Sequence, residues 1–198
     1  MIYYRFFSKI YQVEGKKMCQ ACQDFIKKGS KILDLGCGSG IVGKVFEDFF
    51  QAKLIGVDIE DKRVSPISFQ LIDGKLLPFP KNSFDVVLIN YVLHHSQDPI
   101  ALLKEAKRVA KDKIIIFEDL PEDFLSKLIC QFHAFSSDNL FGNPPKTFFE
   151  LEKDWEEIFR NLKLNIIFKE RIKDFPIKKE LFILDNTYKG GSHPDLSE

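Results

Sequence analysis

Short apolar runs alternate along the chain with amphipathic stretches that have helical spacing. Five apolar runs predict strands at Lys31–Leu35, Lys53–Val57, Ile67–Ile72, Phe84–Asn90 and Lys113–Phe117. The amphipathic stretches predict helices at 13–28, Ile41–Phe50 and Pro99–Lys111. Two further strands are expected at about 163–172 and 179–185, as a hairpin around Pro176. The alternation predicts an α/β fold: a doubly wound, Rossmann-like, seven-stranded sheet, mostly parallel with an antiparallel last strand, and with helices on both faces.

The first predicted strand runs directly into a loop of three alternating glycines, Gly36, Gly38 and Gly40. Strand, glycine loop and helix in this order are typical of the nucleotide-binding half of an open α/β sheet, because glycine lets the backbone approach a ligand closely. A dinucleotide site would need the spacing G-x-G-x-x-G, but position 41 is Ile. Asp34, just before the loop, would repel a pyrophosphate and suits a cationic or amino-bearing ligand.

Acidic residues end four of the predicted strands: Asp34, Asp58, Asp73 and Glu118. Ligands of open parallel sheets bind outside the carboxyl ends of the strands, so this repetition predicts a site there. Asp58 lies about 20 residues after the glycine loop, where a carboxylate can accept hydrogen bonds from both hydroxyls of a ribose.

The segment from Ile32 to Gly40 resembles motif I of the class I S-adenosylmethionine-dependent methyltransferases, and the resemblance extends over about residues 29–120. It implies S-adenosylmethionine as cofactor and S-adenosylhomocysteine as its product. The cofactor-binding residues that it implies are Asp34, Gly36, Cys37, Gly38, Gly40, Asp58, Ile59, Asp73, Gly74, Asn90 and Tyr91. The Leu-Pro-Phe and Leu-His-His patterns that begin at Leu77 and Leu93 are similar to the small-molecule, type 11 branch, which includes quinone-biosynthesis methyltransferases.

Three histidines are candidate catalytic residues. His94 and His95 follow the fourth strand, and His133 lies in the segment after the fifth strand. A base is needed only if the acceptor is protonated, since methyl transfer itself is an in-line displacement. Glu118 and Asp119 are further candidate bases, and each histidine has the alternative of packing or capping a helix.

The composition of the chain restricts the classes of molecule that it can be expected to bind. Lys+Arg and Asp+Glu both number 29, which gives no global electrostatic case for nucleic acid and favours a small-molecule acceptor. No apolar run is long enough for a membrane span, and Met1 to Tyr11 lacks the features of a signal peptide, so we expect a cytoplasmic protein. Many of the 20 phenylalanines lie outside the predicted sheet, and these form either an aromatic lid over a flat or lipophilic acceptor or ordinary core and helix packing. They are Phe6, Phe7, Phe124, Phe132, Phe135, Phe141, Phe148 and Phe149.

The cysteines raise the alternative of a zinc site. Cys19, Cys22, Cys130 and His133 together could supply four zinc ligands. Both pairs lie in helix-like segments, where small buried thiols are ordinary, so we expect no metal site.

We expect one methyltransferase domain over 1–198. Its parts are a helical cap (1–28), the cofactor-binding core (29–120), an acceptor-covering segment (121–162), a strand hairpin (163–186) and a loose tail (187–198). The expected activity is methyl transfer to a small, aromatic or lipophilic acceptor. The alternatives are other adenosylmethionine chemistry or a non-catalytic regulatory role. The sequence leaves the oligomeric state open.

Overall fold

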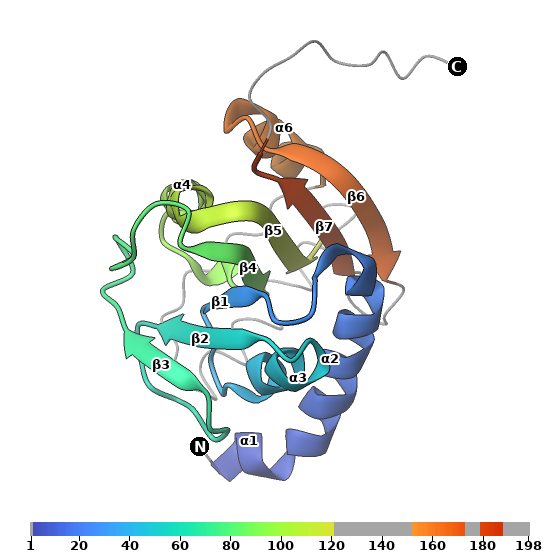
Figure 1. Ribbon diagram of the computed structural model, residues 1–198, viewed down its shortest axis with the longest axis vertical. Coiled ribbons are helices and arrows are strands. Elements are labelled where there is room, and N and C mark those ends of the chain that lie inside the picture. Colours follow the sequence, from blue (N-terminus) through green and yellow to red (C-terminus); the bar gives the residue numbers. More distant parts are fainter. Residues whose placement is uncertain (1, 121–151, 173–178, 188–198) are drawn as a thin grey trace.

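A seven-stranded sheet of order β3-β2-β1-β4-β5-β7-β6 forms the centre of the computed structural model, which describes residues 2–120, 152–172 and 179–187 (Figure 1). The strands are β1 (Lys31–Leu35), β2 (Lys53–Asp58), β3 (Ser68–Leu71), β4 (Phe84–Asn90), β5 (Ala110–Asp119), β6 (Asn165–Ile172) and β7 (Lys179–Asp185). Strands β1 to β5 pair in parallel, and β7 is antiparallel to both β5 and β6. The predicted α/β fold, with its antiparallel last strand, is confirmed.

Helices connect the strands and cover the sheet. They are α1 (Ile2–Phe6), α2 (Ser8–Ala21), α3 (Ile41–Phe49), α4 (Pro99–Val109) and α6 (Glu152–Asn161), with short 3-10 helices η1 (Gln23–Phe25) and η2 (Leu93–His95). Helix α4 begins as its sequence predicts, since Asp98 caps it by accepting a hydrogen bond from the Ala101 N–H at 2.8 Å and Pro99 follows.

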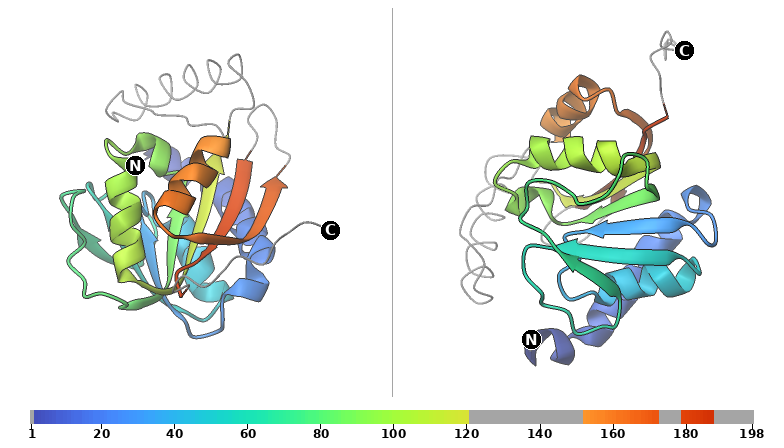
Figure 2. Two further views of the ribbon diagram at one scale, coloured as in Figure 1. Left: turned by 90° about the horizontal axis from the view of Figure 1, so that it is seen from above. Right: turned by 60° about the vertical axis from the view of Figure 1, so that its left-hand side comes forward.

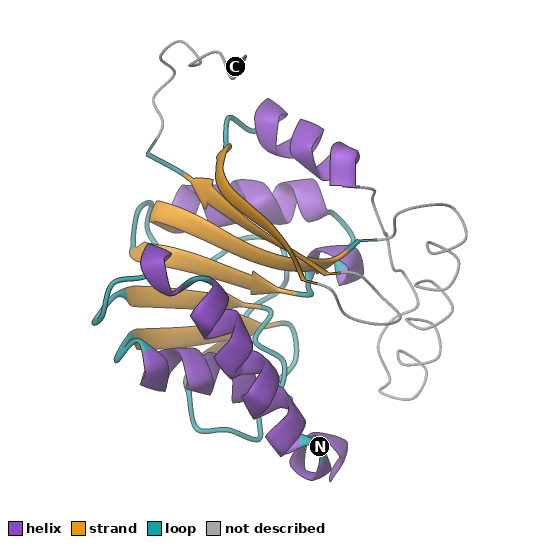
Figure 3. Cartoon of the chain, turned by 90° about the vertical axis from the view of Figure 1, so that its right-hand side faces the viewer, coloured by secondary structure: helices purple, strands orange, loops and turns teal. Residues whose placement is uncertain are grey.

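Neighbouring residues of each strand pack into different hydrophobic clusters, because successive side chains point to opposite faces of a sheet. Leu33 of β1 lies in the cluster with Leu103 of α4 and Trp155 of α6. Ile32 lies in the cluster with Met18 of α2 and Phe46 of α3. Figures 2 and 3 show α4 and α6 on one face of the sheet and α2 and α3 on the other. The prediction of helices on both faces is therefore confirmed.

The predicted bounds of two helices were wrong. The first helix was expected at 13–28, but α2 begins at Ser8 and ends at Ala21, and the chain then tightens into η1. Helix α4 was expected to reach Lys111 but ends at Val109, because Ala110 is extended (φ −71°, ψ 133°) and pairs with Phe84 of β4. The predicted turn around Pro176 lies outside the described residues.

The parallel strands end along one edge of the sheet, and their register decides which residues meet there. Leu35, the last residue of β1, pairs with Val57 of β2 and with Ile89 of β4. Asn90, the last residue of β4, pairs with Phe117 of β5. The residues at the ends of these four strands therefore form one continuous edge. Within the described ranges, no helix has the length and apolar character needed to cross a membrane.

Candidate cofactor site

The glycine loop after β1 is held by the neighbouring strand. The N–H groups of Gly36 and Cys37 both donate to the carbonyl of Val57, at 2.8 and 3.1 Å. Gly36 has φ +77°, and a Cβ built on it would lie 2.5 Å from Val92, so only glycine fits there. Gly38 has φ +50°, but a Cβ on it would meet nothing within 4 Å. The loop thus leaves open space beside Gly38, where a ligand can approach the backbone.

Asp58, at the end of β2, reaches across to this loop. Its Oδ2 accepts a hydrogen bond from the Gly38 N–H at 2.8 Å, and its Oδ1 accepts one from the Ile59 N–H at 2.7 Å. A carboxylate has about four lone-pair positions, so each oxygen keeps capacity for a further donor. The predicted site residues Asp58, Gly38 and Ile59 are therefore brought together.

Asp34 lies beneath the loop within β1 and is 2% exposed. Burial, and secondarily the negative charge of Asp58, raise its pKa to about 7. No hydrogen-bond donor to its carboxyl group is found in the described part of the chain. A buried carboxyl group that ionises near neutral pH and lacks a donor suits a cationic partner.

Gly43 of α3 packs against Asp34 and was missed by the sequence reasoning. A Cβ built at position 43 would lie 2.5 Å from Asp34 Oδ2. The absence of a side chain at Gly43 therefore makes the space that the Asp34 carboxyl group occupies. The sequence does show a fourth glycine three positions after Gly40, but only the contact with Asp34 in the folded structure gives this glycine a role.

The loop after β2 folds back over the glycine loop. The Val64 N–H donates to the carbonyl of Ser39 at 2.9 Å, and Ile67 lies against Gly40. Arg63 secures this loop: its guanidinium binds Asp61 at 2.8 Å and the Ile67 carbonyl at 2.8 Å. The sequence analysis did not single out Arg63, since nothing in its local pattern distinguishes it from other basic residues.

Asp73 and Gly74 follow β3 and form a tight turn. Asp73 Oδ1 accepts hydrogen bonds from the N–H groups of Lys75 at 2.9 Å and Leu76 at 3.4 Å, which lower its pKa. Gly74 has φ +76°, and a Cβ on it would lie 3.1 Å from the Ile59 side chain. The Asp73–Gly74 turn thus lies beside Ile59.

Strand β4 ends at Asn90 on the other side of the glycine loop, and Tyr91 follows it. The amide oxygen of Asn90 is buried without a hydrogen-bond partner in the described residues, which is an uncommon state for a polar atom. Tyr91 has φ +56°, a strained conformation for a residue with a side chain. The ammonium group of Lys179 lies 5.3 Å from the centre of the Tyr91 ring and 3.3 Å from Glu14 of α2. Strain and an unpartnered acceptor at one strand end are typical of functional sites.

His94 is paired with Glu118, a relationship that the sequence did not reveal. Both side chains are buried, and His94 Nδ1 is hydrogen-bonded to Glu118 Oε1. Glu118 also accepts hydrogen bonds from the backbone N–H groups of Leu93 at 3.1 Å and Asp119 at 3.0 Å. Glu118 thus faces the histidine rather than the carboxylates of Asp34 and Asp58. His95 is exposed, its ring centre 4.1 Å from that of His94, and His133 lies outside the described residues.

Three cysteines lie in the described part of the chain. Cys19 and Cys22 are fully buried, and Cys37 of the glycine loop is nearly so. Burial raises the pKa of the Cys22 thiol to about 12, and it raises those of Cys19 and Cys37 as well. Cys130, the remaining cysteine of the considered zinc set, lies outside the described residues. Cys37 lies against Gly56 of β2, where a Cβ would be 2.7 Å from its sulfur, so it acts as a small packing group in the loop.

The fold and the glycine loop together resemble those of class I, Rossmann-like methyltransferases. Residues 33–117 match the family model described as a methyltransferase domain. The resemblance inferred from the sequence is thereby confirmed.

Individual relatives agree with this assignment. The chain is 35% identical over 106 residues to an uncharacterized methyltransferase of Schizosaccharomyces pombe, covering 44% of this chain and 38% of that protein. It is 34% identical over 100 residues to the demethylmenaquinone methyltransferase of Geobacillus stearothermophilus, covering 43% of each. The chain thus spans about two-fifths of the length of these relatives. A solved S-adenosylmethionine-dependent methyltransferase from Methanosarcina mazei has the same fold, with a TM-score of 0.66, 18% identity and coverage of 83% of this chain and 96% of that one.

Proposed function

We propose that the protein transfers a methyl group from S-adenosylmethionine to a small aromatic or lipophilic acceptor by in-line displacement. One observation supports the cofactor assignment most strongly. The Asp58 carboxylate accepts a hydrogen bond from the Gly38 N–H, and the space beside Gly38 is open. The demethylmenaquinone methyltransferase among the relatives supports an acceptor of the quinone type.

The residues of the site fit the separate parts of this cofactor. The free lone pairs of Asp58 suit the two ribose hydroxyls. Asp34, buried and ionising near neutral pH, suits the amino group. Ile59, 61% exposed beside the Asp73–Gly74 turn, offers an apolar surface to the adenine ring. The unpartnered amide oxygen of Asn90 lies at the end of β4, where a polar group of the cofactor or acceptor would satisfy it.

Bound S-adenosylmethionine supplies an activated methyl group, so the chain's residues have to align the acceptor and exclude water. We assign proton removal from a hydroxyl acceptor to His94. In this proposal the His94 Nδ1–H donates to Glu118, so that Nε2 has the lone pair that takes up the proton, and the Glu118 carboxylate stabilises the imidazolium that forms. Glu118 is a positioning residue in this scheme. His95 and His133 are the other proposed candidates.

The test combines binding with turnover. Calorimetric titration with S-adenosylmethionine and S-adenosylhomocysteine, with NAD as a control, should give micromolar binding of the two adenosyl ligands alone. The protein is then incubated with methyl-labelled cofactor and a panel of phenols, hydroquinones and lipid extracts, and products are identified by mass. A methylated hydroquinone or phenol is the expected product.

Other outcomes separate the alternatives. Binding of NAD in place of the adenosyl ligands would overturn the cofactor assignment. Methylation of a protein or an RNA would replace the small-molecule acceptor. Transfer of another part of the cofactor would indicate different adenosylmethionine chemistry, and binding without any transfer would indicate a regulatory domain.

A further inference from the structure

The N-terminal arm, residues 4–14 of α1 and α2, packs less closely than the rest of α2. None of these residues is buried, whereas the second half of the helix buries Gly15, Met18 and Cys19. Gly15 fits closely onto α3, since a Cβ there would lie 3.2 Å from Val45. Figures 1 and 3 show α1 and the first turns of α2 extending past the edge of the sheet. The arm therefore offers an outer face to a partner.

This outer face carries three exposed apolar side chains. Phe6, Ile10 and Val13 are 81%, 63% and 56% exposed. Ile10 and Val13 are three residues apart in α2, which places them on the same side of that helix, and Phe6 is the last residue of the adjoining α1. Single exposed apolar residues are common, but three within eight residues on a projecting arm mark an interaction surface.

Basic residues accompany these exposed apolar side chains. Four basic side chains are exposed on α1 and α2: Arg5, Lys9, Lys16 and Lys17. Glu14 is the single acidic residue of 2–21, and it is paired with Lys179 at 3.3 Å and Lys17 at 3.6 Å. A chain with no net charge thus concentrates positive charge on this one segment.

The positive charge of the N-terminal arm favours some binding partners over others. In a two-fold dimer through this face, the basic side chains of both copies would be brought together and would repel each other. An anionic membrane surface satisfies both features, because its acyl boundary takes the apolar side chains and its headgroups attract the cations. We propose that the N-terminal arm docks the protein onto anionic lipid bilayers, with Phe6, Ile10 and Val13 at the acyl boundary. This inference is independent of the proposed methyl transfer, although it would bring the site close to a lipophilic acceptor.

Vesicle sedimentation with the whole chain tests the proposal. We expect binding to vesicles of phosphatidylcholine and phosphatidylglycerol, weakening as salt rises, and little binding to phosphatidylcholine alone. The double variant Phe6→Ser/Ile10→Ser should lower the partition coefficient at least tenfold, and Lys9→Gln/Lys16→Gln should lower it severalfold. Ile167→Ser on β6 and Lys104→Gln on α4, both exposed, are the matched controls and should change nothing.

Circular dichroism of each variant checks that the fold is retained. Absence of binding to the anionic vesicles would overturn the proposal, as would binding that the arm variants leave unchanged. Light scattering tests the alternative that the arm binds a second copy of the chain. A dimer that dissociates in Phe6→Ser/Ile10→Ser would assign the face to dimerisation instead. Each result can be read without any measurement of methyl transfer.

Discussion

The carboxylate of Asp58 accepts a hydrogen bond from the backbone N–H of Gly38 at 2.8 Å, which joins the end of β2 to the glycine loop after β1. Twenty residues separate the two in sequence. The bond holds the loop and orients the carboxylate that we propose as the acceptor of the ribose hydroxyls. One side chain thus shapes the proposed site and is also proposed to bind the cofactor.

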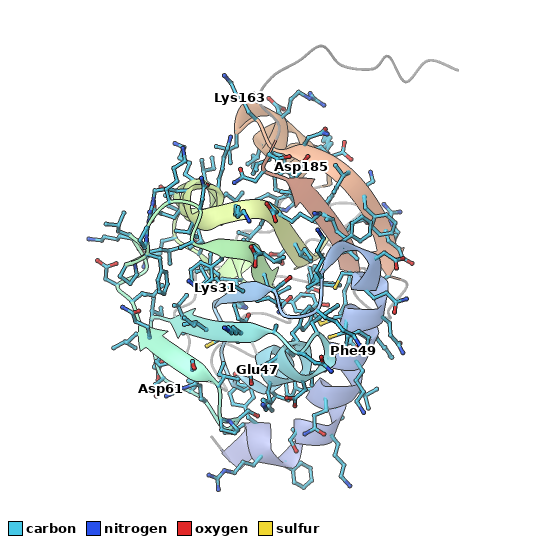
Figure 4. The ribbon with its side chains drawn as sticks, viewed as in Figure 1. Lys31, Glu47, Phe49, Asp61, Lys163 and Asp185 are labelled. Atoms are coloured by element: carbon cyan, nitrogen blue, oxygen red, sulfur yellow. The ribbon has the colours of Figure 1, made fainter. Side chains whose placement is uncertain are left out.

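Replacing Asp58 with Ala should weaken S-adenosylhomocysteine binding about 10- to 150-fold, since hydrogen bonds to a charged group contribute roughly 1.5–3 kcal/mol. Calorimetric titration measures this change. Asp61→Asn is the control, because Asp61 is an exposed carboxylate of the loop after β2, where Figure 4 labels it. Its partner is Arg63. Equal losses of affinity in the two variants would mean that Asp58 acts only by ordering the glycine loop.

The affinity for S-adenosylmethionine should rise as pH increases from 6 to 8. The pKa of Asp34 is raised to about 7, first by burial and then by Asp58, so its carboxyl group becomes negative over this range. An ionised Asp34 attracts the cationic cofactor more strongly. Titrations at several pH values measure the effect, and Asp34→Asn should bind weakly with a flat profile. A rise that persists in Asp34→Asn would assign it to another group.

Asp34 should also make the free energy of unfolding depend on pH, in the opposite direction to the cofactor affinity. Asp34 ionises near its ordinary pKa of 3.8 when unfolded but only near 7 when folded. The unfolded state therefore loses its proton first, and the free energy of unfolding should fall between about pH 4 and pH 7. Asp34→Asn should reduce this fall, which denaturant unfolding at several pH values measures. An identical fall in the variant would contradict the assignment.

Gly43→Ala should lower cofactor affinity more than it lowers stability. The added methyl would lie 2.5 Å from Asp34 Oδ2 and must displace that carboxyl group. Overpacking costs about 1–3 kcal/mol, but alanine also favours the helix by about 1 kcal/mol, so the two effects partly cancel in the melting temperature. Asp48→Ala, exposed on the same helix, is the control for both measurements. Unchanged affinity in Gly43→Ala would show that Asp34 does not need its present position.

Glu118→Gln should lower kcat about 10- to 100-fold and leave cofactor affinity unchanged. The amide keeps the size of the side chain but removes the charge that we propose to stabilise the His94 imidazolium. Turnover is measured with the acceptor found in the panel, and proton–nitrogen NMR of the His94 ring reports which nitrogen carries the proton. Glu60→Gln, at an exposed carboxylate, is the control. A parallel loss of cofactor affinity would mean that Glu118 only supports the structure.

The sequence was most informative where one residue type is needed for a local reason. Val86 to Ile89 form one continuous apolar run because β4 is buried on both faces, and this run was predicted as a strand with the correct ends. Gly36 must be glycine because of its positive φ and the nearby Val92, so the loop could be recognised by pattern alone. Helix ends were less certain: α4 stops at Val109 because Ala110 pairs with β4, a contact between distant segments.

The sequence by itself determined the class of fold, the glycine loop and the order of the acidic strand ends, because each follows from local geometry or from a period of two or 3.6 residues. Only the tertiary structure decided which of these acids act together. Asp34 and Asp58 lie by the glycine loop, while Glu118 turns to His94 and Gly43 makes room for Asp34. These pairings depend on side-chain directions and on the register of neighbouring strands, and neither is encoded in the spacing of residues along the chain.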